Sequence, residues 1–92
     1  MVKVVYNDCF GRFNISKEGM KWLKEHGYSH DKPINNYYNT PNLERSNKLL
    51  VQLVEELGIL ASGLSSNLKV KKLSSNSYKL LNCEGLELII DK

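Results

Sequence analysis

A short segment near the N-terminus contains most of the residue types that could recognise a ligand. Residues 7–13 read NDCFGRF, so a thiol, two phenylalanines, a glycine and an arginine directly follow the apolar run VKVVY. A strand that passes through a glycine-containing loop into a helix presents backbone N–H groups and the positive end of the helix dipole, which favour an anion. Arg12 could hold a phosphate with two hydrogen bonds, and Phe10 or Phe13 could stack on a base.

The same segment also has a purely structural interpretation. Phe10 and Phe13 could cover the edge of the core while Arg12 remains in solvent. The segment is neither a Walker A loop nor a GxGxxG fingerprint, and its single glycine is not specific. The residues alone therefore leave two interpretations open, an anion-binding loop and a structural turn.

The other residues that could do chemistry do not form a catalytic pattern. The two histidines, His26 and His30, are separated by a helix-breaking glycine, and nothing in the sequence pairs either with Cys9 as a base. The same histidines lack the acidic or thiol partners that a metal site requires. Glu55 and Glu56 are adjacent in a helical pattern, so they point in different directions. We therefore expect a protein that is not an enzyme and that uses no metal and no cofactor.

Composition limits the class of protein. A chain of 92 residues with a net charge of +3 should form one domain over residues 1–92 with a modest core. No apolar run approaches the roughly 20 residues that cross a bilayer, and the N-terminus lacks the apolar stretch of a signal peptide. We therefore expect no membrane association, a location in the cytoplasm, and free thiols at Cys9 and Cys83.

Positive charge is densest at Lys69, Lys71 and Lys72, which fall on one predicted strand. A nucleic-acid-binding protein usually concentrates its positive charge on one face. The alternative is the solvated face of an ordinary strand, and we favour it, so nucleic acid is not the expected partner.

Hydrophobic patterning predicts the elements of the first two thirds of the chain. Residues 2–6 read as a strand, and Val4 and Val5 on opposite faces indicate an inner strand that is buried on both sides. Ser16 is a good N-cap for a helix that should bury Met20 and Leu23 and end at a glycine, residue 27. Residues 28–42 form a long irregular connection rich in tyrosine and asparagine. Residues 43–61 then have a helical pattern that should stop at the glycine at position 63.

The last third of the sequence is predicted to be β structure. NLKVKKL and SYKLL read as strands, and CEGLELII contains a Glu84-Gly85 hairpin turn. Alternation places Leu86, Leu88 and Ile90 on the core face. The expected fold class is α+β, a single small domain in the order β-α-α-β-β-β, with one mixed sheet packed against two helices.

Three stretches together resemble a family of small proteins encoded by tailed phages and some giant viruses. NDCFGRFNIS is similar to the family pattern N-x-C-[YF]-G-G-F-x-[LI]-S. The second stretch is RSNKLLVQLVEELGILASGLSSNLKV, which is similar to the family's succession of an arginine, an apolar helix, EELG, A-[NS]-G and LKV. The third is CEGLELI, which is similar to the family's DG-[IL]-E-W hairpin. The match spans most of the chain outside residues 27–44.

We associate this family with the type-four anti-CBASS sponge proteins of phages. The resemblance implies a protein that sequesters a cyclic-nucleotide signal of bacterial immunity, such as a cyclic dinucleotide, without cleaving it. It also implies a homo-oligomer, a dimer or tetramer, because two copies about a two-fold axis double the contacts that a small chain can make. The residues expected to bind the ligand come from the first loop, the segment before the second helix, and SGLSSNLK: Asn7, Cys9, Phe10, Gly11, Arg12, Phe13, Ser16, Arg45, Ser62, Gly63, Asn67 and Lys69.

Three departures from the family pattern bear on the ligand more than on the fold. Arg12 stands where the family has a second glycine, Lys71 and Lys72 replace an acidic run, and Leu88 replaces a tryptophan. The alternative function is a protein-interaction module that inhibits a host defence enzyme through the tyrosine-rich segment 28–42.

Overall fold

The part of the chain that the structure describes contains two α-helices, four strands and a short 3₁₀ helix. The structure is a computed structural model, and it describes residues 2–29, 33–34, 39–74 and 77–91. The α+β class and the expected order are confirmed. The elements are β1 (Val2–Asn7), α1 (Lys17–Glu25), α2 (Lys48–Leu57), the 3₁₀ helix η1 (Gly58–Ala61), β2 (Leu68–Leu73), β3 (Tyr78–Cys83) and β4 (Leu86–Asp91).

The strands form two separate sheets, so the prediction of one mixed sheet is wrong. β1 pairs antiparallel with β2, and β3 pairs antiparallel with β4. At the free edge of β1, the hydrogen-bond acceptors are a loop carbonyl and a side chain, and not the backbone of a third paired strand. The N–H of Val5 donates to the backbone oxygen of Arg45 at 2.8 Å, and the N–H of Asn7 donates to Oε1 of Glu87 at 2.9 Å. These acceptors take the hydrogen bonds that a third strand would otherwise make.

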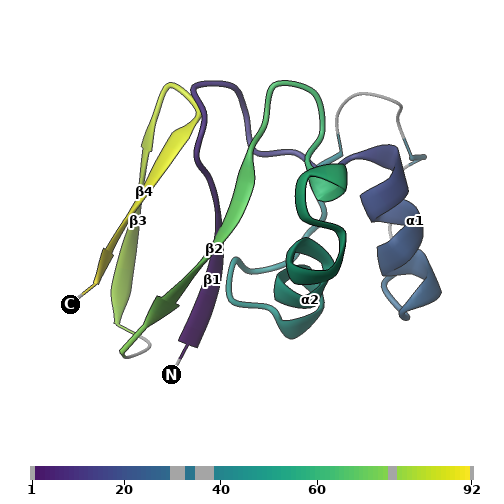
Figure 1. Ribbon diagram of the computed structural model, residues 1–92, viewed down its shortest axis with the longest axis horizontal. Helices are drawn as coiled ribbons and strands as arrows, with labels where there is room; N and C mark the ends of the chain where they lie inside the picture. The colour runs from purple at the N-terminus through teal and green to yellow at the C-terminus, as the bar shows by residue number, and fades with distance from the viewer. Residues whose placement is uncertain (1, 30–32, 35–38, 75–76, 92) are drawn as a thin grey trace.

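The elements follow one another along the long axis of the molecule. Figure 1 shows the β3–β4 hairpin at one end, the β1–β2 ribbon in the middle, and α2 and then α1 at the other end. β1 contacts both α2 and β4, and the hairpin is therefore attached chiefly through β1. The end of β1, where the first loop begins, lies beside the hairpin turn.

The main core lies between the β1–β2 ribbon and the helices. α1 contributes Met20 and Leu23 as predicted, and α2 contributes the fully buried Leu50 and Leu53. Val5 belongs to this core, whereas Val4 is equally buried outside it. Both valines are therefore buried as predicted, although β1 is not an inner strand of a larger sheet.

Helix boundaries follow local capping signals. The Ser16 side chain accepts a hydrogen bond from the N–H of Gly19 at 3.0 Å, and Gly27 has a φ of +99°, so both predicted ends of α1 are confirmed. The second helix is shorter than the pattern indicated. Its N-cap is Asn47, and Gly58 with a φ of +57° ends it and begins η1. None of the described helices is long and apolar enough to cross a membrane.

The β3–β4 hairpin turns at Glu84-Gly85 as predicted. Both residues have positive φ, +52° and +96°, as a two-residue type I′ turn requires. The face of β4 that is buried is the opposite of the one we predicted. Leu88 and Ile90, which we expected in the core, are 49% and 43% exposed, whereas Glu87 is 2% exposed. The face of β4 that carries the Glu87 carboxylate can be buried because Asn7 and Arg45 supply hydrogen-bond partners for that carboxylate.

Candidate functional site

A pocket lies where the first loop meets the hairpin and the segment before α2. Its volume is about 470 Å³. Two pockets of similar size, beside α2 and beside Tyr28, contain none of the residues that the sequence singled out as ligand-binding. The pocket at the first loop brings together residues from these three segments of the chain: Arg12, Phe13, Thr40, Arg45, Asn82, Gly85 and Glu87.

Arg45 has a fixed position in this pocket. Its Cζ lies 3.4 Å from the centroid of the Phe13 ring, so one face of the guanidinium covers one face of the ring. One of its terminal nitrogens, Nη2, donates to Oε2 of Glu87 at 2.6 Å. Its Nε is buried and has no hydrogen-bond partner among the described residues. The stack and the ion pair therefore fix the plane of this side chain.

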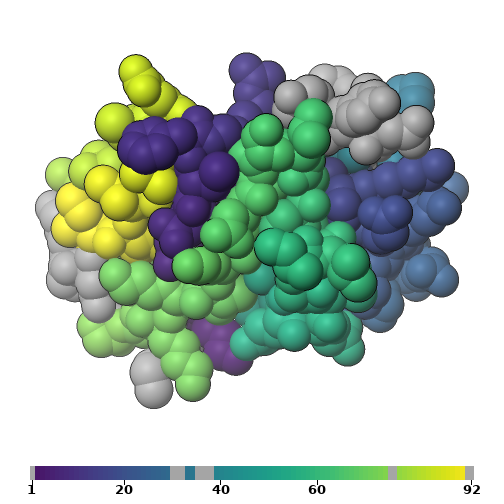
Figure 2. All heavy atoms as spheres, turned by 45° about the horizontal axis from the view of Figure 1, so that its top comes forward, coloured from purple at the N-terminus to yellow at the C-terminus, as the bar shows by residue number. Residues whose placement is uncertain are grey.

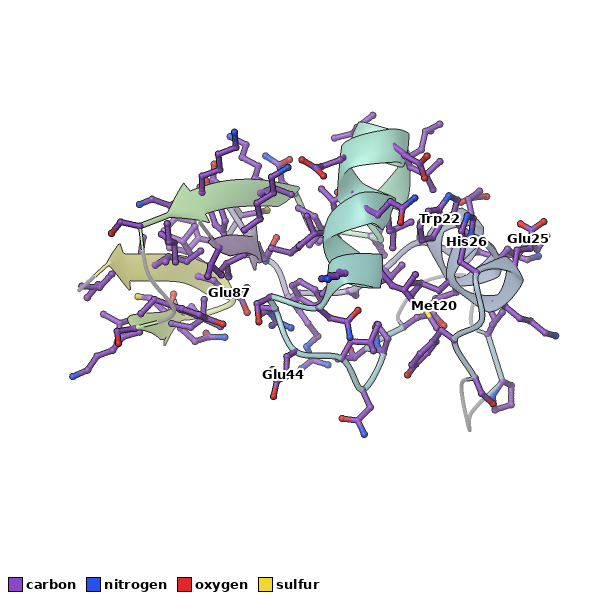
Figure 3. The ribbon with its side chains drawn as sticks, turned by 90° about the horizontal axis from the view of Figure 1, so that it is seen from below. Met20, Trp22, Glu25, His26, Glu44 and Glu87 are labelled. Atoms are coloured by element: carbon purple, nitrogen blue, oxygen red, sulfur yellow. The ribbon has the colours of Figure 1, made fainter. Side chains whose placement is uncertain are left out.

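Glu87 supports Arg45 from the buried face of β4. Figure 3 labels Glu87 on the side of the hairpin that faces the segment carrying Glu44, immediately before Arg45. Its second oxygen accepts the N–H of Asn7 at 2.9 Å. A carboxylate can be buried when it is both paired and hydrogen-bonded, and Glu87 meets both conditions.

Glu87 was not predicted as a site residue, because the alternation of Leu86 and Leu88 indicated that the opposite face of the strand was the core face. A signal was present, since Glu87 is an acidic residue within the otherwise apolar run LELII. Its partner Arg45 is 42 residues away in the chain, and a local pattern cannot identify such a partner.

Arg12 supplies the positive charge of the pocket that no acid balances. It is exposed, and it makes no ion pair within the described ranges. The charge of Arg45 is compensated by Glu87, so the residues that line the pocket have one net positive charge. A guanidinium free on its donor side can bind a phosphate with two hydrogen bonds.

Gly11 has a packing role that explains the glycine in the first loop. A Cβ at this position would lie 1.6 Å from the backbone oxygen of Ser65, and a Cβ at Gly85 would lie 1.3 Å from the oxygen of Gly11. Figure 2 shows the loop, in dark purple, lying between the yellow-green hairpin and the green segment that follows η1. The backbone of Gly11 is therefore held between two neighbouring loops, where a side chain would not fit.

Asn7 is a buried clamp and does not line the pocket. Its amide nitrogen donates to the backbone oxygens of Cys9 at 3.1 Å and Gly85 at 2.9 Å, and its Oδ1 accepts the N–H of Asn67 at 2.8 Å. Asn7 and Asn67 thus join the first loop, the hairpin turn and the segment before β2. Both were expected to bind the ligand, and the structure places them in hydrogen bonds that hold the loops together.

The N-terminus of α1 lies away from the pocket. The Ser16 hydroxyl caps the helix and donates to the backbone oxygen of Leu60, and Ala61 covers the first turn near Gly19. No residue of the first turn of α1 lines the pocket, and the expectation that the helix dipole and Arg12 act on one anion stays a prediction. Among the described residues, the N–H groups of residues 10–13 donate to no protein acceptor, and of these residues Arg12 and Phe13 line the pocket.

The remaining predicted residues lie around the loops and outside the pocket. Phe10 is 66% exposed, and the Cys9 thiol lies 3.5 Å from the oxygen of Ser65. Cys9 and Cys83 are both free thiols, as predicted. The Ser62 hydroxyl accepts the N–H at the start of β2, and a Cβ at Gly63 would collide with the side chain of Asn14.

Lys69 pairs with Asp8 at 2.7 Å on the exposed face of β2. The hydrogen bond to Asp8, and then the charge of Asp8, raise the pKa of Lys69 above its ordinary 10.5. This lysine is therefore engaged by an acid and does not face the pocket. The described residues include no group of three or more His, Cys, Asp or Glu side chains placed to hold a metal ion.

Comparisons with known proteins identify no relative. No family model matches the chain, and neither the curated proteins nor the solved structures include a match. Of the residues that the sequence analysis expected at a ligand site, Arg12, Phe13 and Arg45 line the pocket.

Proposed function

We propose that the chain is a viral immune-evasion protein that binds and sequesters a cyclic-nucleotide immune signal without cleaving it. The observation that carries the proposal is the pocket lined both by Arg12, which makes no ion pair with the described residues, and by a fixed Arg45. The resemblance of the first loop and the second-helix region to the anti-CBASS sponge proteins supports the same function.

The residues of the pocket suit a phosphate ester. Arg12 can donate two hydrogen bonds to phosphate oxygens. Thr40 and Asn82 also line the pocket, and polar side chains of these types suit a sugar or a base, although the Asn82 Oδ1 already accepts the N–H of Gly85 at 3.0 Å.

The same residues favour binding over hydrolysis. Glu87 is the carboxylate that lines the pocket, and both of its oxygens already accept hydrogen bonds. A general base needs an oxygen within reach of the proton that it removes. Glu87 is therefore poorly placed for that role, and a sequestering protein needs only tight binding.

We also propose that the binding unit is a homo-oligomer, a dimer or a tetramer. A chain of 92 residues has little surface with which to enclose a dinucleotide alone, and the volume of its pocket at the first loop is about 470 Å³. A two-fold axis would bring two such pockets to the two halves of a cyclic dinucleotide. Sedimentation equilibrium with and without cyclic di-AMP tests this, and a monomer under both conditions would contradict it.

Isothermal titration calorimetry with a panel of cyclic di- and trinucleotides tests the function. Wild-type protein is expected to bind at least one member. Arg12→Ala should bind it more weakly by roughly 1.5–3 kcal/mol, because a hydrogen bond to a charged group is lost. Lys21→Ala, which removes an exposed cation from α1, is the matched control and should not change the affinity. A panel that gives no heat with wild-type protein removes the proposal.

A protein-interaction function is the second candidate, and one observation favours it. Leu81, Leu88 and Ile90 are 45%, 49% and 43% exposed on the outer face of the hairpin, and Leu81 pairs directly with Leu88. Tyr37 and Tyr38 of the segment that suggested this function lie outside the described residues, and Tyr28 packs against the core.

The two candidates respond differently to substitution. An inhibitor of a host defence enzyme that acts through the hairpin should be inactivated by Leu88→Lys and unaffected by Arg12→Ala. A nucleotide sponge should show the reverse in an assay of immune signalling.

A further inference from the structure

We infer that a nucleobase stacks on the guanidinium of Arg45 and not on a phenylalanine, with Glu87 acting as the positioning residue for that stack. The bound state would then have three layers, the Phe13 ring, the Arg45 guanidinium and the base. This inference rests on the proposed nucleotide-binding function and specifies which part of the ligand Arg45 recognises.

Phe13 has no free ring face to offer to a ligand. It is 6% exposed, and the guanidinium carbon of Arg45 lies 3.4 Å from its centroid. That separation is van der Waals contact, so a base cannot enter between them. Phe10 has an exposed ring but does not line the pocket. The two aromatic residues of the first loop therefore do not supply the stacking surface in the pocket.

The guanidinium of Arg45 can supply that surface. A guanidinium has two faces, and Phe13 covers one of them. The side chain of Arg45 is 21% exposed and lines the pocket, so the base would lie against the second face of this guanidinium. Bases stack on arginine planes as they do on aromatic rings, and the positive charge adds attraction to the electron-rich ring.

Glu87 fixes the plane in advance of binding. The bond from Nη2 of Arg45 to Oε2 of Glu87 is 2.6 Å, and Glu87 is itself held by the N–H of Asn7. The backbone oxygen of Arg45 is also held, by the N–H of Val5 at 2.8 Å. A long side chain that is already ordered loses little conformational entropy when a ligand binds. The ion pair therefore contributes to affinity without touching the ligand.

The two arginines of the pocket have separate tasks in this arrangement. Arg12, whose charge no described acid compensates, binds phosphate. Arg45 has a charge that Glu87 compensates, and its flat face binds the base. A ligand that contains both a base and a phosphate uses both residues, whereas a sugar phosphate uses Arg12 alone.

Titration of AMP and of ribose 5-phosphate, which differ only in the base, tests this division. Wild-type protein should prefer AMP by about 5- to 150-fold, the range for one stacked base. Arg45→Lys keeps a cation beside Glu87 and removes the plane, so the preference should fall to near 1 while the affinity for ribose 5-phosphate is unchanged. Arg12→Ala should weaken both probes by the same factor and keep the preference.

Wild-type protein also provides a test that needs no variant. Nuclear Overhauser contacts are expected between the H2 or H8 proton of adenine and the Hδ protons of Arg45. Contacts to the Phe10 ring in place of Arg45, or a preference for AMP that Arg45→Lys retains, would overturn the inference.

The outcome for wild-type protein separates this inference from the proposed function. If the protein binds cyclic di-AMP but binds AMP no more tightly than ribose 5-phosphate, the proposed function stands and the stack on Arg45 is refuted. If the protein binds none of cyclic di-AMP, AMP and ribose 5-phosphate, both the proposed function and the stack are refuted.

Discussion

Replacement of Glu87 by glutamine is the most direct test of how the pocket is held together. Glu87 is 2% exposed, and its two oxygens accept hydrogen bonds from Nη2 of Arg45 at 2.6 Å and from the N–H of Asn7 at 2.9 Å. Glutamine has nearly the same shape and keeps one acceptor oxygen. The substitution removes the negative charge and replaces one acceptor with a donor that faces another donor.

The expected loss follows from the bonds that cannot be kept. One charge-assisted hydrogen bond is worth about 1.5–3 kcal/mol, and the charge of a mostly buried Arg45 is left unpaired. Loss of one partner from a fully buried pair costs about 3–5 kcal/mol. Arg45 keeps some access to water, so we expect Glu87→Gln to lower the free energy of unfolding by about 2–3 kcal/mol.

Urea denaturation followed by circular dichroism measures this loss. Glu84→Gln is the matched control, because Glu84 is an exposed acid in the turn of the same hairpin, and it should change the free energy of unfolding by less than about 0.5 kcal/mol. A Glu87→Gln variant as stable as Glu84→Gln would refute the account of the buried ion pair.

Three further predictions concern the first loop and its neighbours. Gly11→Ala should lower the free energy of unfolding by roughly 3 kcal/mol, the upper end for overpacked sites, because its Cβ would lie 1.6 Å from a backbone oxygen. Gly27→Ala is the control, because the space around Gly27 is open, and it should cost only about 1–2 kcal/mol of backbone strain. Asp8→Asn should return the pKa of Lys69 toward its ordinary 10.5, as NMR titration of the lysine can show. In wild-type protein this pair should add stability below pH 10.5 that is lost as the pH rises through the raised pKa. Arg12→Ala should leave the urea midpoint unchanged, because this exposed side chain makes no ion pair within the described ranges, and a lowered midpoint would assign it a structural role.

The sequence predicted those features of the fold that depend on neighbouring residues. Ser16 caps α1 and Glu84-Gly85 forms the hairpin turn, because an N-cap and a two-residue turn are decided by the chemistry of a few consecutive residues. The order of elements followed from such signals. The end of α2 was missed because Gly58 lies within an apolar pattern that continues through η1.

Features that depend on distant residues were not predictable in the same way. Whether β4 joins β1 in one sheet is decided by Arg45 and Glu87, which occupy the edge of β1. The direction of the hairpin is decided by the same pair, and alternation of leucines predicted the opposite face. Of the candidate site, Arg12 and Arg45 were identified from their residue type and place in the chain, whereas the packing role of Gly11 required the positions of two other loops.

A crystal structure of the protein with bound cyclic di-AMP tests the central claim most directly. The account predicts a phosphate within hydrogen-bond distance of the Arg12 guanidinium and a base against the uncovered face of Arg45, at a subunit contact. Nucleotide bound at another surface, or crystals grown with saturating cyclic di-AMP in which the pocket holds no nucleotide, would contradict it.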